Sequence, residues 1–165
     1  MQLVIEHALA ISSCEAFEAV FFDEPFNVAL GEALQLGRVL MRLERTTDRV
    51  VRVVAYEPRR DNASPAEARG RSRRGFVEEL DWDLRTHCGT WRTVPNAFAD
   101  RVRSAGTIDV SMRGAEVVRV VRGELVVKLF AFGGRVEKLI AAEMARSYAR
   151  SATFMREWMT RAARA

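Results

Sequence analysis

His7 is the residue best suited to acid–base chemistry, because the pKa of an imidazole lies near neutrality. It alternates with Leu3 and Ile5 along a short N-terminal segment, which directs it toward the same side as those apolar residues. No motif ties a nucleophile or a carboxylate to it. His7 is therefore a catalytic candidate without partners, and a hydrogen-bonded structural histidine is the alternative interpretation.

His87 and Cys88 are adjacent and could both ligate a metal, but no further ligand follows at the spacing of a zinc site. We therefore predict no metal and no cofactor. Cys14 and Cys88 are too few for a disulfide framework, which favours a cytoplasmic location. Residues 1–7 lack the basic lead of a secretory signal, and no run approaches the ~20 apolar residues of a membrane span.

Carboxylates crowd the segment from Glu78 to Asp83, and paired carboxylates can act as general acid and base. Strand alternation places Glu79, Asp81 and Asp83 on the face opposite Leu80 and Trp82. The prediction is a solvated outer face, not a catalytic pair.

Two arginines, Arg119 and Arg122, interrupt a β-branched run that reads as a central strand. Charge on a central strand must be paired or solvated. We expect each of them to pair with Glu116 or Glu124, in a structural role.

The net charge of +4 is concentrated in one segment, residues 58–75. This segment combines arginines with Pro, Ser and Gly and has no apolar periodicity, which predicts a mobile loop. It could touch an anionic membrane surface transiently. Nucleic-acid binding is not expected, because no aromatic side chains are interleaved with the arginines.

Period-two patterns predict seven strands, near 2–9, 36–44, 50–56, 76–84, 89–95, 101–112 and 116–129. Ser12 or Ser13 can cap a first short helix, and Pro25 opens a second. Gly123, inside the last strand, is expected to mark a bulge or bend. From about Arg135 the apolar residues recur at helical spacing, which predicts a long terminal helix.

Hairpin-length links between successive strands imply antiparallel pairing, and we expect the first strand beside the last. A helix with one apolar stripe must bury that stripe, so the sheet should curl around it. The fold class is therefore α+β, a curved seven-stranded antiparallel sheet around a C-terminal helix, in a single domain over residues 1–165.

Three strings carry a family resemblance: Glu6-His7, the segment 89–96 (GTWRTVPN), and 123–129 (GELVVKL) running into 133–140 (GGRVEKLI). They resemble the DUF2505 branch of the START-like superfamily, whose fold is also called helix-grip, polyketide cyclase or Bet v 1-like. The resemblance covers nearly the whole chain and implies a cavity between sheet and helix that holds apolar molecules.

Bulky apolar residues with a few polar ones suit such a cavity, because the polar groups orient a mostly apolar ligand. The predicted ligand-binding residues are Trp82, Trp91, Thr93, Ile108, Val110, Ile140, Met144, Ser147, Tyr148, Ser151 and Met155. The same residues could instead fill a dry core.

Three functions remain open at this point. The first is binding or carriage of a small hydrophobic molecule resembling a lipid, sterol or polyketide. The second is an enzyme of the polyketide cyclase or aromatase kind. The third is an interaction module whose cavity has collapsed.

Overall fold

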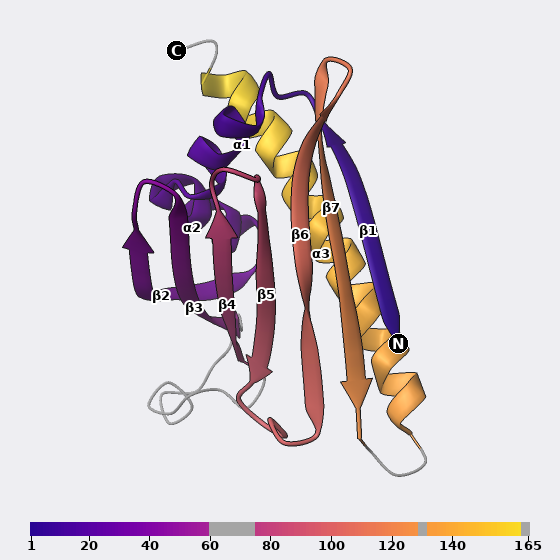
Figure 1. Ribbon diagram of the computed structural model, residues 1–165. Helices are drawn as coiled ribbons and strands as arrows, with labels where there is room; N and C mark the ends of the chain where they lie inside the picture. Colours follow the sequence, from indigo (N-terminus) through magenta and orange to yellow (C-terminus); the bar gives the residue numbers. More distant parts are fainter. Residues whose placement is uncertain (60–74, 129–131, 163–165) are drawn as a thin grey trace.

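The computed structural model describes residues 1–59, 75–128 and 132–162. Its seven strands form one antiparallel sheet in the order β1-β7-β6-β5-β4-β3-β2 (Figure 1). The strands are β1 (Gln2–Leu9), β2 (Leu36–Arg45), β3 (Arg49–Pro58), β4 (Phe76–Asp83), β5 (Cys88–Pro95), β6 (Val102–Arg113) and β7 (Glu116–Val127). The first strand lies beside the last, as predicted.

Two short helices link β1 to β2. Helix α1 (Cys14–Phe21) is capped by Ser13, whose hydroxyl accepts a hydrogen bond from the Ala16 N–H. Helix α2 (Glu24–Ala33) is capped by the Asp23 carboxylate, and Pro25 lies in its first turn. Both caps satisfy amide groups that have no partner inside the helix. The predicted helix starts are confirmed.

Helix α3 (Gly133–Ala162) crosses the sheet on the side away from the viewer in Figure 1. Its closest backbone contacts are with β7, β1 and α2. The helix begins two residues earlier than predicted, because Gly133 and Gly134 adopt helical conformation and the Phe132 carbonyl accepts hydrogen bonds from the Arg135 and Val136 N–H groups. None of the described helices is long and apolar enough to cross a membrane.

The outer face of the sheet carries the predicted row of charges. Asp81 pairs with Arg49, Glu79 with Arg92 and Asp83 with Arg85. The prediction of a solvated outer face at Glu79, Asp81 and Asp83 is therefore confirmed. The predicted mobile loop at 58–75 falls mainly on 60–74, which lies outside the described residues.

The expected partners of the two β7 arginines were wrong. Arg122 pairs with Asp109 on β6, at 2.5 Å, because the two side chains lie on the outer face of neighbouring strands. Arg119 points to the opposite face and bonds to α3. Residues an odd number of positions apart on a strand face opposite sides, so Arg119, three positions before Arg122, could not share the partners of an outer-face residue.

Gly123 lies in regular pairing with both neighbouring strands, so the expected bulge is not there. A register shift occurs instead in β2, between Leu40 and Arg42. Gly123 makes room for the indole of Trp91, since a Cβ at Gly123 would stand 2.5 Å from Trp91 Cζ2. The indole also donates from Nε1 to the Thr107 carbonyl, at 3.1 Å.

We expect Gly123→Ala to destabilise the fold by about 1–3 kcal/mol, because the new methyl group must displace a buried indole. Gly134→Ala is the matched control: no atom lies within 4 Å of its Cβ position, and Ala favours a helix by about 1 kcal/mol over Gly. Urea unfolding of both variants checks this. Equal stability of Gly123→Ala and wild type would show that Trp91 is not fixed by this contact.

Candidate functional site

The concave face of the sheet and the facing side of α3 form the main core. Its buried members include Trp82, Trp91, Ile108, Val110 and Met155, while Ile140, Met144 and Tyr148 pack against them partly buried. Ser151 is also buried, and Ser147 and Thr93 are intermediate. The structure thus brings eight of the eleven predicted residues into one core cluster; Ser151 joins it through its hydrogen bond with Arg119, and Ser147 and Thr93 are half-buried on α3 and β5.

Trp82 has a separate role inside this core. It packs under α1 against Phe17, Phe21 and Phe22, and its indole Nε1 donates to Glu18 Oε1 at 2.7 Å. All of its polar capacity is used by the protein. Trp82 therefore holds α1 on the sheet.

Charged side chains also point into this interior. Arg52 on β3 is buried, stacks over the rings of Phe21 and Phe22, and donates to the Phe21 carbonyl. Its carboxylate partner is Glu78 on β4, at 3.5 Å. The pair brings both signs of charge to the concave face.

Arg119 on β7 is only 1% exposed and forms no ion pair with a described carboxylate. It donates to the Tyr148 carbonyl at 3.1 Å and to Ser151 Oγ at 3.4 Å, and it stacks on the Tyr148 ring at 5.0 Å. Burial lowers the pKa of this guanidinium. A buried charge of this kind is costly unless it is compensated.

Tyr148 and Tyr56 show that the interior is not uniformly closed. Each keeps some accessible surface, yet desolvation, with the nearby Glu78 charge, raises both pKa values, that of Tyr56 to about 12. Both half-buried side chains therefore hold their phenol groups in a largely desolvated environment. Arg119 stacks on the Tyr148 ring and donates to its carbonyl, so these two groups lie together on the concave face.

Six polar atoms at separate places on the sheet are fully enclosed and have no hydrogen-bond partner in the described structure. They are His7 Nδ1, Arg38 Nε and Nη2, Arg52 Nε, Ser104 Oγ and Arg119 Nε. More than 90% of buried polar groups in proteins are hydrogen-bonded, so each of these exceptions requires a cause.

The two histidines differ in environment. His7 faces Arg119 across the β1–β7 pairing, and desolvation followed by the Arg119 and Arg156 charges lowers its pKa, so its imidazole is neutral at pH 7. His87 Nδ1 lies 3.0 Å from Glu18 Oε1, at the edge of α1. Within the described residues no three His, Cys, Asp or Glu side chains cluster as a metal site.

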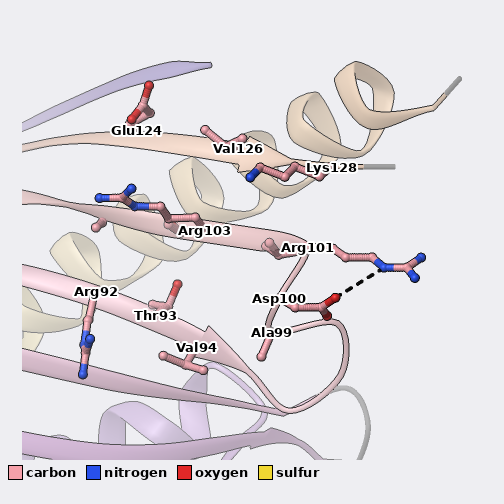
Figure 2. A pocket seen from close by; sticks show the side chains of 13 residues that line it. Arg92, Thr93, Val94, Ala99, Asp100, Arg101, Arg103, Glu124, Val126 and Lys128 are labelled. Carbon is pink, nitrogen blue, oxygen red and sulfur yellow. Dashed lines mark ion pairs between the residues drawn. The ribbon is translucent and has the colours of Figure 1, made fainter. Parts of the chain in front are cut away.

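A hollow of about 520 Å³ opens where β5 and β6 part, beyond the Thr93–Ser104 pair (Figure 2). Its rim carries Arg92, Arg101, Arg103 and Lys128. A second, shallower hollow of about 360 Å³ lies between α2 and α3. Neither coincides with the predicted pocket walled by Trp91, Met144 and Tyr148, which stays a prediction.

The sequence matches the model of one protein family, described as "Protein of unknown function (DUF2505)", over residues 9–159. The chain belongs to the DUF2505 family. No curated protein is significantly similar to it.

Solved structures share the fold of this DUF2505 protein. TTHA0849 from Thermus thermophilus has a TM-score of 0.65 at 15% identity, over 98% of this chain and 99% of that one. CV1439 from Chromobacterium violaceum has a TM-score of 0.59 at 9% identity, covering 94% and 96%. Norcoclaurine synthase from Thalictrum flavum has a TM-score of 0.51 at 19% identity, covering 94% and 87%. These likenesses confirm the START-like, helix-grip fold.

Three polar members of the interior, Arg52, Tyr56 and Glu78, were not predicted from the sequence. Alternation along the strand could have predicted them, because Glu78 shares the face of Leu80 and Trp82. Arg52 and Tyr56 likewise share the face of Val54.

Tyr56 and Tyr148 are the chain's two tyrosines, so phenolate absorbance reports on this region alone. The fold favours the protonated phenols; this stabilisation is complete below pH ~10, the unfolded pKa, and is lost as the pH rises through about 12. We expect almost no phenolate in the native protein at pH 10.5 and about three-quarters ionisation there in denaturant. Tyr56→Phe and Tyr148→Phe assign the two signals. Native titration near pH 10 would contradict their enclosure.

Proposed function

We propose that the protein binds a small, mostly apolar molecule that carries a hydrogen-bond-accepting group, between the concave face of the sheet and α3. The observation that supports this most is the set of enclosed donors without partners, led by Arg119 and Arg52. An acceptor on a ligand would satisfy donors whose burial otherwise costs free energy.

The walls around these donors suit an apolar ligand body. Met144 and Ile140 on α3 are only partly buried although they face the core cluster. A thioether side chain changes rotamer at little cost, so Met144 can move aside for ligands of several shapes. Burial of about 10 methylene groups at ~0.8 kcal/mol each gives roughly 8 kcal/mol before the cost of association.

The fold is compatible with this proposal. Norcoclaurine synthase, which has the same fold, is named for the formation of a specific compound. At 19% identity the likeness extends to the fold and to no individual residue. The proposal therefore depends on the side chains of this chain.

A second candidate function is catalysis of the cyclase or aromatase kind. The observation that favours it is the His7–Arg119 pair beside Tyr148, in which a neutral imidazole adjoins a buried guanidinium. A neutral imidazole can accept a proton, and a guanidinium can stabilise the resulting anion. Native mass spectrometry separates the two functions, since a carrier releases its co-purified ligand unchanged whereas an enzyme converts it over time.

We expect Met144→Trp to lower the uptake of an apolar fluorescent probe by about tenfold or more, because the indole occupies the space of the ligand. Ala142→Trp is the matched control, since this neighbouring residue faces solvent and should leave uptake unchanged. Probe titration and thermal unfolding of both variants provide the measurement.

A different result would favour the collapsed interaction module. In that case the wild type binds no apolar probe, and Met144→Trp costs several kcal/mol of stability because the space was already filled. Such a result would contradict the proposed function.

A further inference from the structure

Phe98 combines backbone strain with exposure. Its φ of 61° lies in the left-handed region, which bulky side chains rarely adopt, and the residue is 62% exposed. Such a conformation costs on the order of 1–3 kcal/mol. Burial of the ring does not offset this cost, so the position holds an aromatic side chain outward at the expense of stability.

Two more large apolar side chains are exposed near this end of the molecule. Phe132, just before α3, is 59% exposed, and Leu139 in the second turn of α3 is 66% exposed. The β5–β6 loop, which contains Phe98, is joined to the end of β7, because the Lys128 N–H donates to the Arg101 carbonyl at 2.7 Å. Figure 1 shows the β5–β6 loop and the start of α3 at the same end of the sheet.

Cations accompany these apolar side chains. Lys128 and Lys138 are the only lysines of the chain, and both are exposed here without an ion pair to a described carboxylate. Arg101 forms a solvent-exposed ion pair with Asp100, at 3.7 Å (Figure 2). Glu137, the nearest acidic residue of α3, is occupied by the Val127 N–H and the N-terminal ammonium.

We propose that this docking face, made of Phe98, Phe132, Leu139, Arg101, Lys128 and Lys138, binds the surface of an anionic lipid bilayer. Apolar side chains at loop tips enter the boundary between headgroups and acyl chains, and surrounding cations attract anionic headgroups. The cation-rimmed hollow between β5 and β6 lies beside Arg101 and Lys128 and has room for a headgroup phosphate.

Charge complementarity favours a membrane over a protein partner. The exposed cations on this face exceed its free carboxylates, and negative headgroups form a continuous surface that can meet two separate loops at once. The docking face lies on the exterior, so this inference goes beyond the proposed interior binding and does not need it.

Co-sedimentation with vesicles tests the proposal. We expect wild type to bind phosphatidylcholine vesicles that contain phosphatidylglycerol more tightly than phosphatidylcholine alone, and less tightly in high salt. Lys128→Gln and Lys138→Gln should each lower binding to the anionic vesicles about fivefold. Absence of any preference for anionic vesicles would overturn the proposal.

Phe98→Asn separates docking from stability. Asn tolerates left-handed backbone, so this variant should unfold at the same temperature as wild type or higher, while its vesicle binding falls about tenfold. Val39→Thr, at an exposed apolar residue on the distant strand β2, is the control and should leave binding unchanged. Undiminished vesicle binding by Phe98→Asn, or a lower unfolding temperature, would overturn the proposal.

Two further results keep this test distinct from the test of interior binding. Vesicle binding by a protein that takes up no apolar probe would support the docking face and contradict only the interior site. Self-association of the wild type that is lost in Phe98→Asn, without vesicle binding, would assign the face to a protein contact and overturn the lipid proposal.

Discussion

The placement of α3 depends on the buried guanidinium of Arg119. It joins β7 to the middle of the helix through the Tyr148 carbonyl, the Ser151 hydroxyl and the Tyr148 ring. Apolar packing alone is tolerant of sliding and rotation, whereas these directional contacts fix both. Because no described carboxylate neutralises Arg119, the same residue leaves positive charge in the interior. One side chain, Arg119, therefore both fixes the position of α3 and supplies the positive charge that a ligand could meet.

The short helices are attached in a related way. Arg52 reaches the carbonyl at the end of α1, and Trp82 donates to Glu18 within it. Polar side chains of the concave face thus hold helices against the sheet while the apolar residues fill the space between. Each arginine has more donors than its attachment uses, which is why Arg52 and Arg119 both retain an enclosed Nε without a partner. The donors without partners are thus a consequence of the way the helices are attached, and an acceptor on a ligand would pair with them.

Much of this fold follows from local pattern. Strand and helix periods, the caps of α1 and α2, and short links are encoded within a few residues, and the links account for the neighbouring strands from β2 to β7. Tertiary partners are not encoded in this way. Alternation shows that Arg119 and Arg122 face opposite sides, but only the position of α3 reveals what Arg119 meets. Gly123 similarly suggests a break in the strand, and its actual role depends on Trp91, 32 positions earlier in the chain. Strand alternation alone could have predicted one more polar residue of the interior, since Glu78 lies on the inward-facing side of its strand.

The two halves of α3 differ in how deeply their apolar side chains are buried. The C-terminal half contributes Ser151, Ala152 and Met155, all buried. In the N-terminal half Ala141 is also buried, whereas the larger side chains of Ile140 and Met144 are only partly buried. Local opening is easiest where the fewest apolar contacts are lost. The first turns of α3 are thus the part of the lid over the concave face that separates at the least cost. They also lie beside the proposed docking face, so a bilayer bound there would adjoin the end of the interior that opens most readily. Both proposals would then describe one path, from a membrane surface to the donors beneath α3.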